Sequence, residues 1–254
     1  MNALQQHGYA RFDYMKELDY EGIEKDYEEL KTYFDSLPKD EYAVGLNRYR
    51  RYSRALVLPT SKTIEWLPNI EKNNQLFAAY FQGKFNPEHA GDYREFPAID
   101  KKILDNKLLQ KIIMANYEKT FWSKEDKIMP IHVGVHFVKL NVENPDDIAI
   151  SSPNSLHQDG EPFTFAHLIE RYNVEGGTNA IGIPEVRHML PEETKEGELH
   201  EVFEITEPLE SYGVYDKKVS HYVSPIKRGN LPDSGRRSVI LIDYQLTVVA
   251  EMEE

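Results

Sequence analysis

Apolar residues recur every three or four positions in two segments, residues 19–38 and 101–122, and charged residues fill the positions between them. This spacing predicts amphipathic helices with one buried face. In the first segment the apolar positions are Ile23, Tyr27, Leu30 and Phe34, followed by Pro38 as a stop; in the second they are Ile103, Leu104, Leu108, Leu109, Ile112 and Ile113. We therefore expect a mainly helical support region over residues 1–127.

From about residue 128 the apolar period changes to two. Ile131, Val133, Val135 and Phe137 alternate with other residues, which predicts a strand. Further short strands are expected in residues 161–174, 200–208, 217–226 and 236–252. Helices followed by a run of strands favour an α+β fold with an antiparallel sheet or sandwich. The polar, turn-rich stretch near 184–200 interrupts the strands as a surface insertion or a lid.

Composition narrows the classes of function. The 254 residues carry 30 basic and 43 acidic side chains, a net charge of −13, which argues against nucleic acid or an anionic membrane as a partner. There is no cysteine, so disulfides, cysteine nucleophiles and thiolate metal sites are excluded. The N-terminus lacks the order of a signal peptide and no apolar run approaches 18 residues, so we expect a cytoplasmic protein without a membrane span.

The segment 151–162 contains a histidine and an aspartate two positions apart, His157 and Asp159, among helix- and strand-breaking residues. Side chains at i and i+2 of a strand point the same way, about 6.5–7 Å apart, so the two could meet at one metal ion. Taken alone, such a pair is more often a polar surface turn. A third ligand is offered by His221, 62 residues after Asp159, on a short apolar strand. The alternative for His221 is a core histidine bonded to a backbone carbonyl.

Arg237 follows His221 by 16 residues and opens the most apolar strand of the chain. It is either a rim charge or a buried anion clamp. Two histidines and one carboxylate form the facial triad of non-haem Fe(II) oxygenases, which leaves positions for a 2-oxo acid and O₂. The far carboxylate of 2-oxoglutarate is suited to the planar guanidinium of arginine. The adjacent Arg236 is the alternative clamp.

In these motifs the chain resembles the bacterial Fe(II)/2-oxoglutarate-dependent dioxygenases that hydroxylate free amino acids, the group typified by L-isoleucine 4-hydroxylase. The resemblance is carried by SSPNSLHQDGEPFTFAHLIERYN, EGGTNAIG, KKVSHYVSPI and RRSVILIDY, and more weakly by GVHFVKL and RYRRYSR. It implies a double-stranded β-helix, or jelly roll, with the N-terminal helices packed outside one sheet. It also implies one domain over residues 1–254, with the jelly-roll core in 128–250.

The resemblance assigns roles to single residues. His157, Asp159 and His221 would hold the iron, and Arg237 would bind the distal carboxylate of 2-oxoglutarate. Glu161 could meet the ammonium group of an amino acid, or be a solvated turn carboxylate. Arg54, with Arg51 as its alternative, could meet the substrate carboxylate, or belong to an Arg–Tyr surface cluster.

The sequence thus predicts an iron enzyme that uses 2-oxoglutarate and O₂ to hydroxylate the side chain of a free L-amino acid, releasing succinate and CO₂. Three alternatives stay open. The substrate could be another small acid or a carrier-bound residue, the chain could be a non-catalytic jelly-roll binding module, or it could be a cupin-type metal isomerase. The oligomeric state is also open, with a homodimer as one option.

Overall fold

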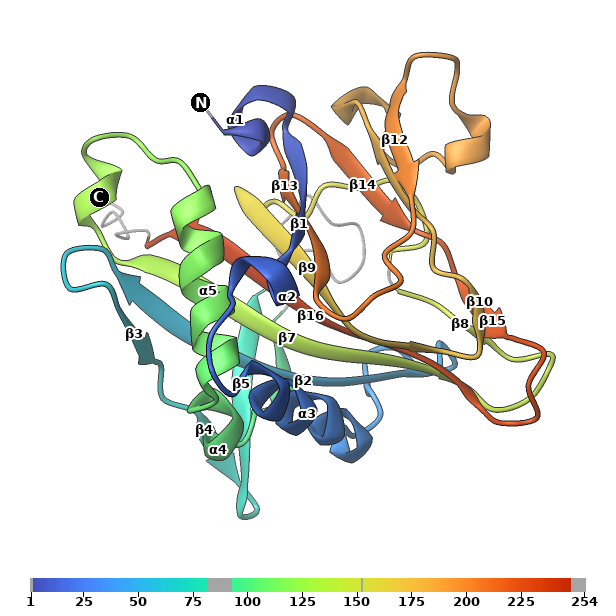
Figure 1. Ribbon diagram of the computed structural model, residues 1–254, viewed down its shortest axis with the longest axis horizontal. Helices are drawn as coiled ribbons and strands as arrows, with labels where there is room; N and C mark the ends of the chain where they lie inside the picture. Colours follow the sequence, from blue (N-terminus) through green and yellow to red (C-terminus); the bar gives the residue numbers. More distant parts are fainter. Residues whose placement is uncertain (1, 82–92, 152, 248–254) are drawn as a thin grey trace, which may run out of the picture.

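A seven-stranded antiparallel sheet runs through the computed structural model, which describes residues 2–81, 93–151 and 153–247. Its strand order is β1-β13-β9-β16-β7-β2-β3, so strands far apart in the sequence lie side by side (Figure 1). In that order, the strands are β1 (Tyr9–Asp13), β13 (Glu210–Tyr215), β9 (Phe163–Tyr172), β16 (Gly235–Leu246), β7 (Ile131–Val142), β2 (Arg48–Leu58) and β3 (Thr63–Trp66).

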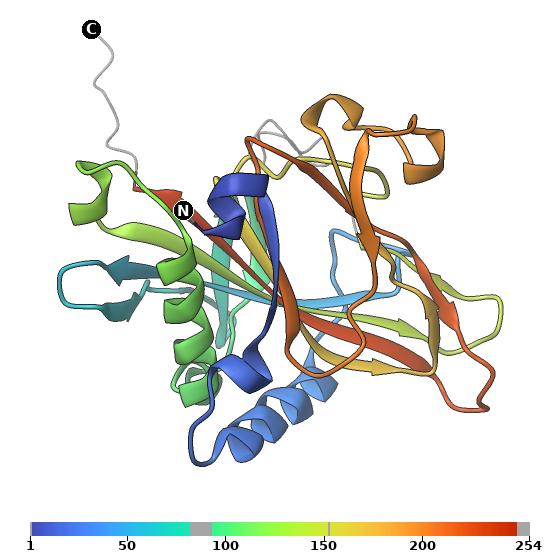
Figure 2. The same ribbon diagram turned by 45° about the horizontal axis from the view of Figure 1, so that its top comes forward.

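Helices cover one face of this main sheet, as the rotated view makes clear (Figure 2). They are α1 (Ala3–His7), α2 (Tyr14–Glu17), α3 (Ile23–Tyr33), α4 (Lys101–Leu104) and α5 (Lys107–Lys119), with the 3-10 turn η1 (Phe34–Ser36). The other 3-10 turns of the described residues are η2 (Asp126–Ile128), η3 (Pro184–Val186) and η4 (Pro191–Glu193), and η3 and η4 lie away from this face, beside β12 (Figure 2). Both predicted amphipathic helices are confirmed. The second is broken at Asn106, whose side chain accepts a hydrogen bond from the Leu109 amide and so begins α5 as its N-cap.

Three smaller sheets complete the fold. The first consists of β12 (Leu199–Phe203), β11 (Asn179–Gly182) and β14 (Ser220–Val223); the second of β10 (Val174–Gly176), β15 (Ile226–Arg228) and β8 (Ile148–Ala149); the third of β4 (Ile70–Lys72), β5 (Gln75–Phe81) and β6 (Tyr93–Pro97). Ile181 of β11 and Phe203 of β12 pack in one hydrophobic cluster with Val138 of β7 and Val239 of β16. The first small sheet therefore lies against the face of the main sheet that the helices leave free.

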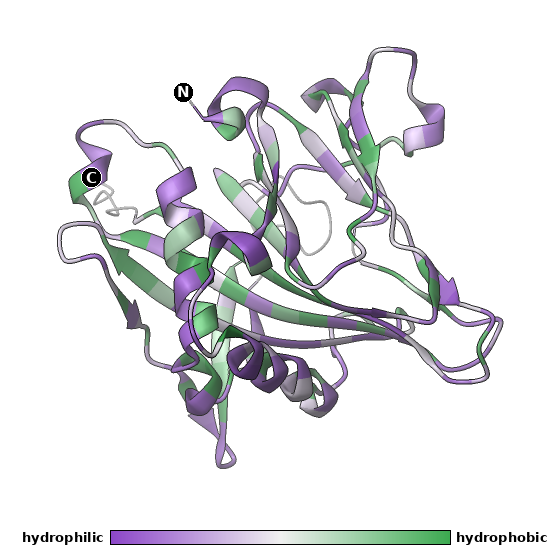
Figure 3. Cartoon of the chain, viewed as in Figure 1, coloured by the Kyte–Doolittle hydropathy of each residue, from purple (hydrophilic) through white to green (hydrophobic). Residues whose placement is uncertain are grey.

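The period-two pattern of β7 separates two different environments. Ile131, Val133, Val135 and Phe137 are fully buried in the cluster shared with the helices. The residues between them face the other side of the sheet, towards the small sheets. Figure 3 shows hydrophobic colour along the main sheet and hydrophilic colour on the outer side of α3. The helix-covered face holds the main core, because most of the buried apolar side chains belong to its cluster. Burial of each large one contributes about 1.5–3 kcal/mol to the free energy of unfolding.

The expectation of a mainly helical region over residues 1–127 is wrong, because β1 to β6 all lie there. The Arg- and Tyr-rich segment is the eleven-residue strand β2, paired with β7 and β3. Its core-facing positions include Ser53, Ala55 and Val57, while Arg50, Tyr52 and Arg54 face the inside of the molecule. The second face of β2 carries charged side chains although it is enclosed. In the sequence alone, such a strand looks like a cluster of surface residues. The predicted last strand ends at Leu246, and residues 248–252 lie outside the described residues.

A buried histidine fastens the helices to the main sheet. His167 of β9 is fully buried, its Nδ1 lies 2.9 Å from Ser211 Oγ and its Nε2 lies 3.0 Å from Asn116 Nδ2. Ser211 donates its own proton to the Leu209 carbonyl, so His167 Nδ1–H donates to Ser211 and Nε2 accepts from Asn116. Both ring nitrogens are satisfied only in the neutral form. Burial accordingly lowers the pKa of His167 to about 3.

We predict that the free energy of unfolding falls as the pH drops below about 6.5, partly because of His167. The unfolded imidazole takes up a proton near pH 6.5, whereas the folded one stays neutral until about pH 3. At pH 5 this one group should remove ~2 kcal/mol of stability. Urea unfolding at pH 7 and pH 5 measures the loss, and His167→Gln should be less stable at pH 7 but less sensitive to pH. An equal pH sensitivity in both proteins would contradict the assignment.

Candidate metal centre and active-site cavity

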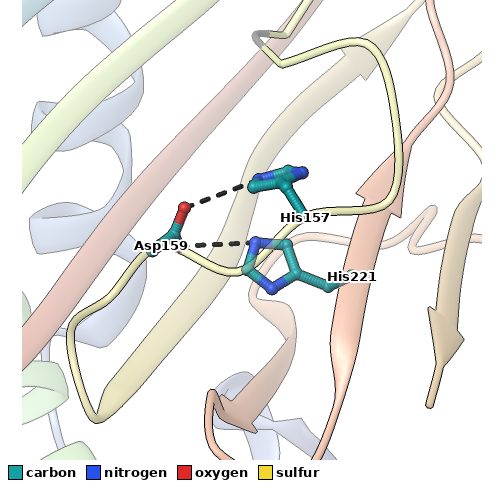
Figure 4. Close-up of side chains that lie close together, drawn as sticks. All are labelled: His157, Asp159 and His221. Atoms are coloured by element: carbon teal, nitrogen blue, oxygen red, sulfur yellow. Dashed lines mark ion pairs between the residues drawn. The ribbon is translucent and has the colours of Figure 1, made fainter. Parts of the chain in front are cut away.

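His157, Asp159 and His221 converge on one point, although they come from two distant segments of the chain (Figure 4). One possible ligand atom from each lies within 4.8 Å of the other two. Asp159 Oδ1 is 3.5 Å from His157 Nε2, and Asp159 Oδ2 is 3.3 Å from His221 Nε2. Two imidazoles and a carboxylate so arranged match the donor set of a non-haem Fe(II) facial triad.

The backbone brings the two histidines together. The His157 amide donates to the His221 carbonyl and the His221 amide donates to the His157 carbonyl, both at 2.9 Å. This is an isolated antiparallel bridge between β14 and the loop before β9, so the His-x-Asp pair does not lie on a regular strand. Asp159 turns towards the histidines at the point where the chain leaves the bridge.

The protonation of the three side chains suits a cation. His157 Nδ1 lies 2.8 Å from the Ser155 carbonyl oxygen, so it carries the proton and leaves Nε2 free on the side of Asp159. Burial works to raise the pKa of Asp159, but the charge of His221 and the hydrogen bonds of both imidazoles hold that pKa well below its usual value. An ionised carboxylate beside two ring nitrogens that can be neutral is a site that a divalent ion fits.

Asp216 clamps the loop that carries Asp159. Its Oδ1 accepts from the Asp159 amide and its Oδ2 from the Gly160 amide, both at 3.0 Å. Its own backbone is held by two more bonds, from its amide to the Pro162 carbonyl and from the Gln158 side chain to its carbonyl. Asp216 lies between β13 and β14, so this clamp links the Asp159 loop to the segment that leads to His221.

A cavity of about 450 Å³ opens beside Asp159. One part of its wall is aromatic, with Tyr52 from β2, Tyr80 and Phe81 from β5 and Tyr93 from β6. Polar groups line the rest: Arg54, His132, Asp159, Gly160, Glu161 and Gln245. A cavity of this size that combines aromatic walls with charged and polar groups is typical of a small-molecule site.

Two lining residues, the acid Glu161 and the base Arg54, have no partner of opposite charge among the described residues. Glu161 is 6% exposed, and its only side-chain hydrogen-bond partner among the described residues is the Tyr80 hydroxyl, which donates to it at 3.4 Å. Burial first, then the charges of Asp243 and Asp159, raise its pKa well above the usual value. Arg54 forms no ion pair in the described part of the chain, and its buried Nε has no hydrogen-bond partner there. The raised pKa holds the Glu161 carboxyl neutral until a cation pairs with it, and the ammonium group of a ligand would favour its ionised form.

The two neighbouring arginines of β16 face opposite sides of the main sheet. Arg236 pairs with Glu170 through two hydrogen bonds of 2.5 and 3.0 Å on the helix-covered side. Arg237 is 3% exposed, points to the inside, and makes no hydrogen bond or ion pair with any described residue. Of the two clamps considered from the sequence, Arg237 has the placement that a buried anion needs.

With the geometry in place, comparison with known proteins identifies the family. The model of the family described as 2OG-Fe dioxygenase matches residues 31–243, most of the chain. The chain belongs to the 2OG-Fe dioxygenase family. It is accordingly an enzyme of the type that uses Fe(II), 2-oxoglutarate and O₂, as the motifs predicted.

Two curated proteins with sequences similar to this dioxygenase have names that refer to isoleucine. One is L-isoleucine-4-hydroxylase of Bacillus thuringiensis, 32% identical over 192 residues, which cover 74% of this chain and 70% of the relative. The other is 3(1)-hydroxy-L-isoleucine 4-dioxygenase of Pantoea ananatis (strain AJ13355), 26% identical over 226 residues, which cover 86% of this chain and 80% of the relative.

Solved structures match the fold of this dioxygenase. The crystal structure of IDO from Bacillus thuringiensis superposes with a TM-score of 0.73 at 23% identity, covering 96% of this chain and 92% of that one. A bsmA homolog from Methylobium petroleophilum PM1 gives 0.75 at 16% identity, covering 96% and 90%. With the antiparallel sheets and the helices on one side, these matches confirm the predicted jelly-roll-like α+β fold. Every helix of the described residues is too short or too polar to traverse a membrane.

The structure sorts the remaining sequence candidates. Arg51 lies on the helix side of β2 and bonds the Ala98 carbonyl at 2.6 Å, away from the cavity. The stretch 184–200 contributes no described lining residue to the cavity. It packs instead on the loop before the metal centre, where the His188 amide donates to the Leu156 carbonyl at 2.6 Å.

Sequence reasoning missed Asp216 and Tyr80. Asp216 lies five residues before His221, and that proximity was the one signal it offered. Tyr80 belongs to a strand in the region expected to be helical, so no pattern connected it with the cavity.

We predict that Asp216→Asn weakens metal binding about tenfold, because residues that hold a ligand in place typically account for 10- to 100-fold in affinity. The asparagine keeps one acceptor but turns an N–H against the second amide. Equilibrium dialysis with Fe(II) under nitrogen measures the change.

The control is Asp147→Asn. Asp147 also accepts two backbone amides, from Glu143 and Asn144 at 3.0 and 2.8 Å, but in a turn with no metal ligand. Equal affinities in the two variants would show that the Asp216 clamp does not position the metal centre.

Proposed function

We propose that this dioxygenase hydroxylates the side chain of a free L-amino acid. The observation that carries the proposal is an acid and a base, Glu161 and Arg54, that lack a partner of opposite charge among the described residues and line the cavity that also reaches Asp159. A free amino acid has an ammonium and a carboxylate on one carbon and can pair with both groups at once. A carrier-bound residue has no free carboxylate and would leave Arg54 without a partner.

The proposed iron ligands are His157, Asp159 and His221. Their support is the geometry of the cluster and the family to which the chain belongs. A bound Fe(II) ion would supply the site of O₂ activation. One oxygen atom of O₂ would enter succinate as 2-oxoglutarate loses CO₂, and the other would enter a C–H bond of the amino acid. The protein's own part is to hold the three ligands through the backbone bridge and the Asp216 clamp.

Arg237 is the proposed partner of the distal carboxylate of 2-oxoglutarate. A guanidinium can donate two parallel N–H bonds to a carboxylate, and inside the protein such a bond is stronger than in water. The burial of Arg237 without a protein partner supports this role. It also keeps water away from that end of the co-substrate.

Glu161 and Arg54 are the proposed anchors of the substrate's ammonium and carboxylate. Anchoring both charged groups fixes which carbon of the side chain faces the metal, and positioning of this kind can lower a barrier by several kcal/mol. The aromatic walls of the cavity would enclose the rest of the side chain. The names of the two relatives, both of which refer to isoleucine, support a free amino acid as the substrate class. The single-domain organisation and a homodimer stay predictions.

We predict that the iron-loaded protein, given 2-oxoglutarate and O₂, forms succinate faster with at least one free L-amino acid, and that this amino acid gains one oxygen atom. Mass spectrometry of the amino acid and a succinate assay, run across all free amino acids, measure both products. His221→Ala should abolish both signals, with Arg236→Met as a control outside the site.

Hydroxylation of a peptide or carrier-bound residue but of no free amino acid would contradict the substrate class and leave the dioxygenase assignment intact. Absence of 2-oxoglutarate turnover with every substrate would favour the non-catalytic alternative.

We further predict that Glu161→Gln raises the KM for the amino acid at least tenfold, because it removes the charge that faces the ammonium while keeping the shape. The apparent affinity for 2-oxoglutarate should change little. Tyr80→Phe, which removes only the hydroxyl near Glu161, is the matched control and should have the smaller effect on KM. A Glu161→Gln enzyme with unchanged KM would exclude Glu161 as the ammonium partner.

A further inference from the structure

A second arginine lies directly opposite Arg237. Arg171 of β9 is the register partner of Arg237 of β16, so the two side chains leave the same face of the main sheet. The Arg171 side chain is 13% exposed, and Arg237 is 3% exposed. Two guanidinium groups are therefore enclosed next to each other on the inner side of the molecule.

Both groups reach the backbone at Gly177. A Cβ atom built on Gly177 would lie 2.9 Å from Arg171 Nη1 and 3.2 Å from Arg237 Nε, so the two nitrogens approach one point. Each is buried and lacks a hydrogen-bond partner among the described residues. Gly177 also has φ +72°, a conformation that side-chain-bearing residues rarely adopt. The absence of a side chain there leaves room between the arginines.

The charges around this point do not balance. Arg171 Nη2 lies 3.3 Å from Glu204 Oε2, and the other oxygen of Glu204 accepts from the Thr178 hydroxyl at 2.8 Å. Glu204 is 41% exposed, so solvent screens its charge. Burial lowers the pKa of Arg237 to about 10, and the charge of Arg171 adds to that lowering. One half-exposed carboxylate thus faces two enclosed cations, and one anion is missing.

The point lies within reach of the metal centre. The Thr178 amide donates to Ser224 Oγ at 3.0 Å, and the Ser224 amide donates to the Thr178 carbonyl at 2.8 Å. Ser224 follows His221 by three residues, which is about 10 Å along an extended chain. A five-carbon diacid held at the metal centre by its 2-oxo acid group would have its far carboxylate several bonds away, a separation that long arginine side chains at this point could span.

We propose that Arg171 and Arg237 together form a two-guanidinium site for the distal carboxylate of 2-oxoglutarate. The inference rests on the proposed function and adds a second cation to it. A carboxylate has about four lone-pair positions, so it can accept bonds from both guanidinium groups. The ion pair with Glu204 holds Arg171 in place through Nη2 and leaves Nη1 for the ligand. Arg171 is thereby a specificity residue that favours dicarboxylic over monocarboxylic 2-oxo acids.

The test compares two co-substrate probes in three proteins. The probes are 2-oxoglutarate and 2-oxovalerate, which has the same chain length but no distal carboxylate. The proteins are the unaltered chain, Arg171→Met and the control Arg236→Met. Each substitution removes an arginine that pairs with a glutamate, Glu204 or Glu170, but Arg236 faces the helices and not the inner side. Titration calorimetry with Mn(II)-loaded protein gives the Kd without turnover, and thermal unfolding checks the fold of each variant.

We expect Arg171→Met to weaken 2-oxoglutarate about tenfold, which corresponds to about 1.4 kcal/mol, while its Kd for 2-oxovalerate and both Kd values of Arg236→Met change by less than about twofold. Equal weakening of both probes by Arg171→Met, or no weakening of 2-oxoglutarate, would overturn the two-arginine site while the proposed function stands. Failure of the unaltered protein to bind 2-oxoglutarate would overturn the proposed function and this inference with it. If Arg171→Met does not fold, Arg171→Lys replaces it and should weaken only 2-oxoglutarate, because the point charge remains but the fork is lost.

Discussion

Two reciprocal backbone hydrogen bonds between His157 and His221 hold the site together. They join a loop before β9 to the strand β14, and they bring both imidazoles to one side of Asp159. If the loop were flexible, binding of a metal ion would have to order it, at a large cost in conformational entropy. The bridge and the Asp216 clamp remove that cost in advance, because they fix the ligand loop by main-chain contacts that do not depend on a bound ion.

The inner side of the main sheet places charge where a globular protein normally has apolar side chains. Arg237, Arg171, Arg54 and Glu161 all lie there with incomplete pairing among the described residues. Such groups are expensive to enclose, and the helix-covered face offsets the cost with a large apolar core. One face of the sheet thus holds the apolar core, and the other carries the residues proposed to bind ligands.

The sheet also explains why Arg236 and Arg237 differ so sharply. Side chains alternate between the faces of a strand, so the first meets Glu170 under the helices and the second faces the interior. The choice between them depended on which residues of β16 face the core, and Ile240, Ile242 and Tyr244 settle it by packing with the helices. Arg237 is an odd number of positions away from each of these three residues on the same strand. Its side chain therefore points to the opposite face, away from the helices.

The local elements and the order of the candidate ligand motifs can be predicted from the sequence alone. The helical period of α3 and α5 and the period-two pattern of β7 are strong because each buries one apolar face. The pattern of β2 was misleading, because its second face is charged yet enclosed. No pattern pointed to Tyr80 or Arg171, and Asp216 was marked only by its proximity to His221. Those residues matter through partners 33 to 81 positions away in the sequence, for example Arg237 opposite Arg171. Only the tertiary structure decides such pairings, because register between distant strands is set by the packing of whole sheets and leaves no period in the chain.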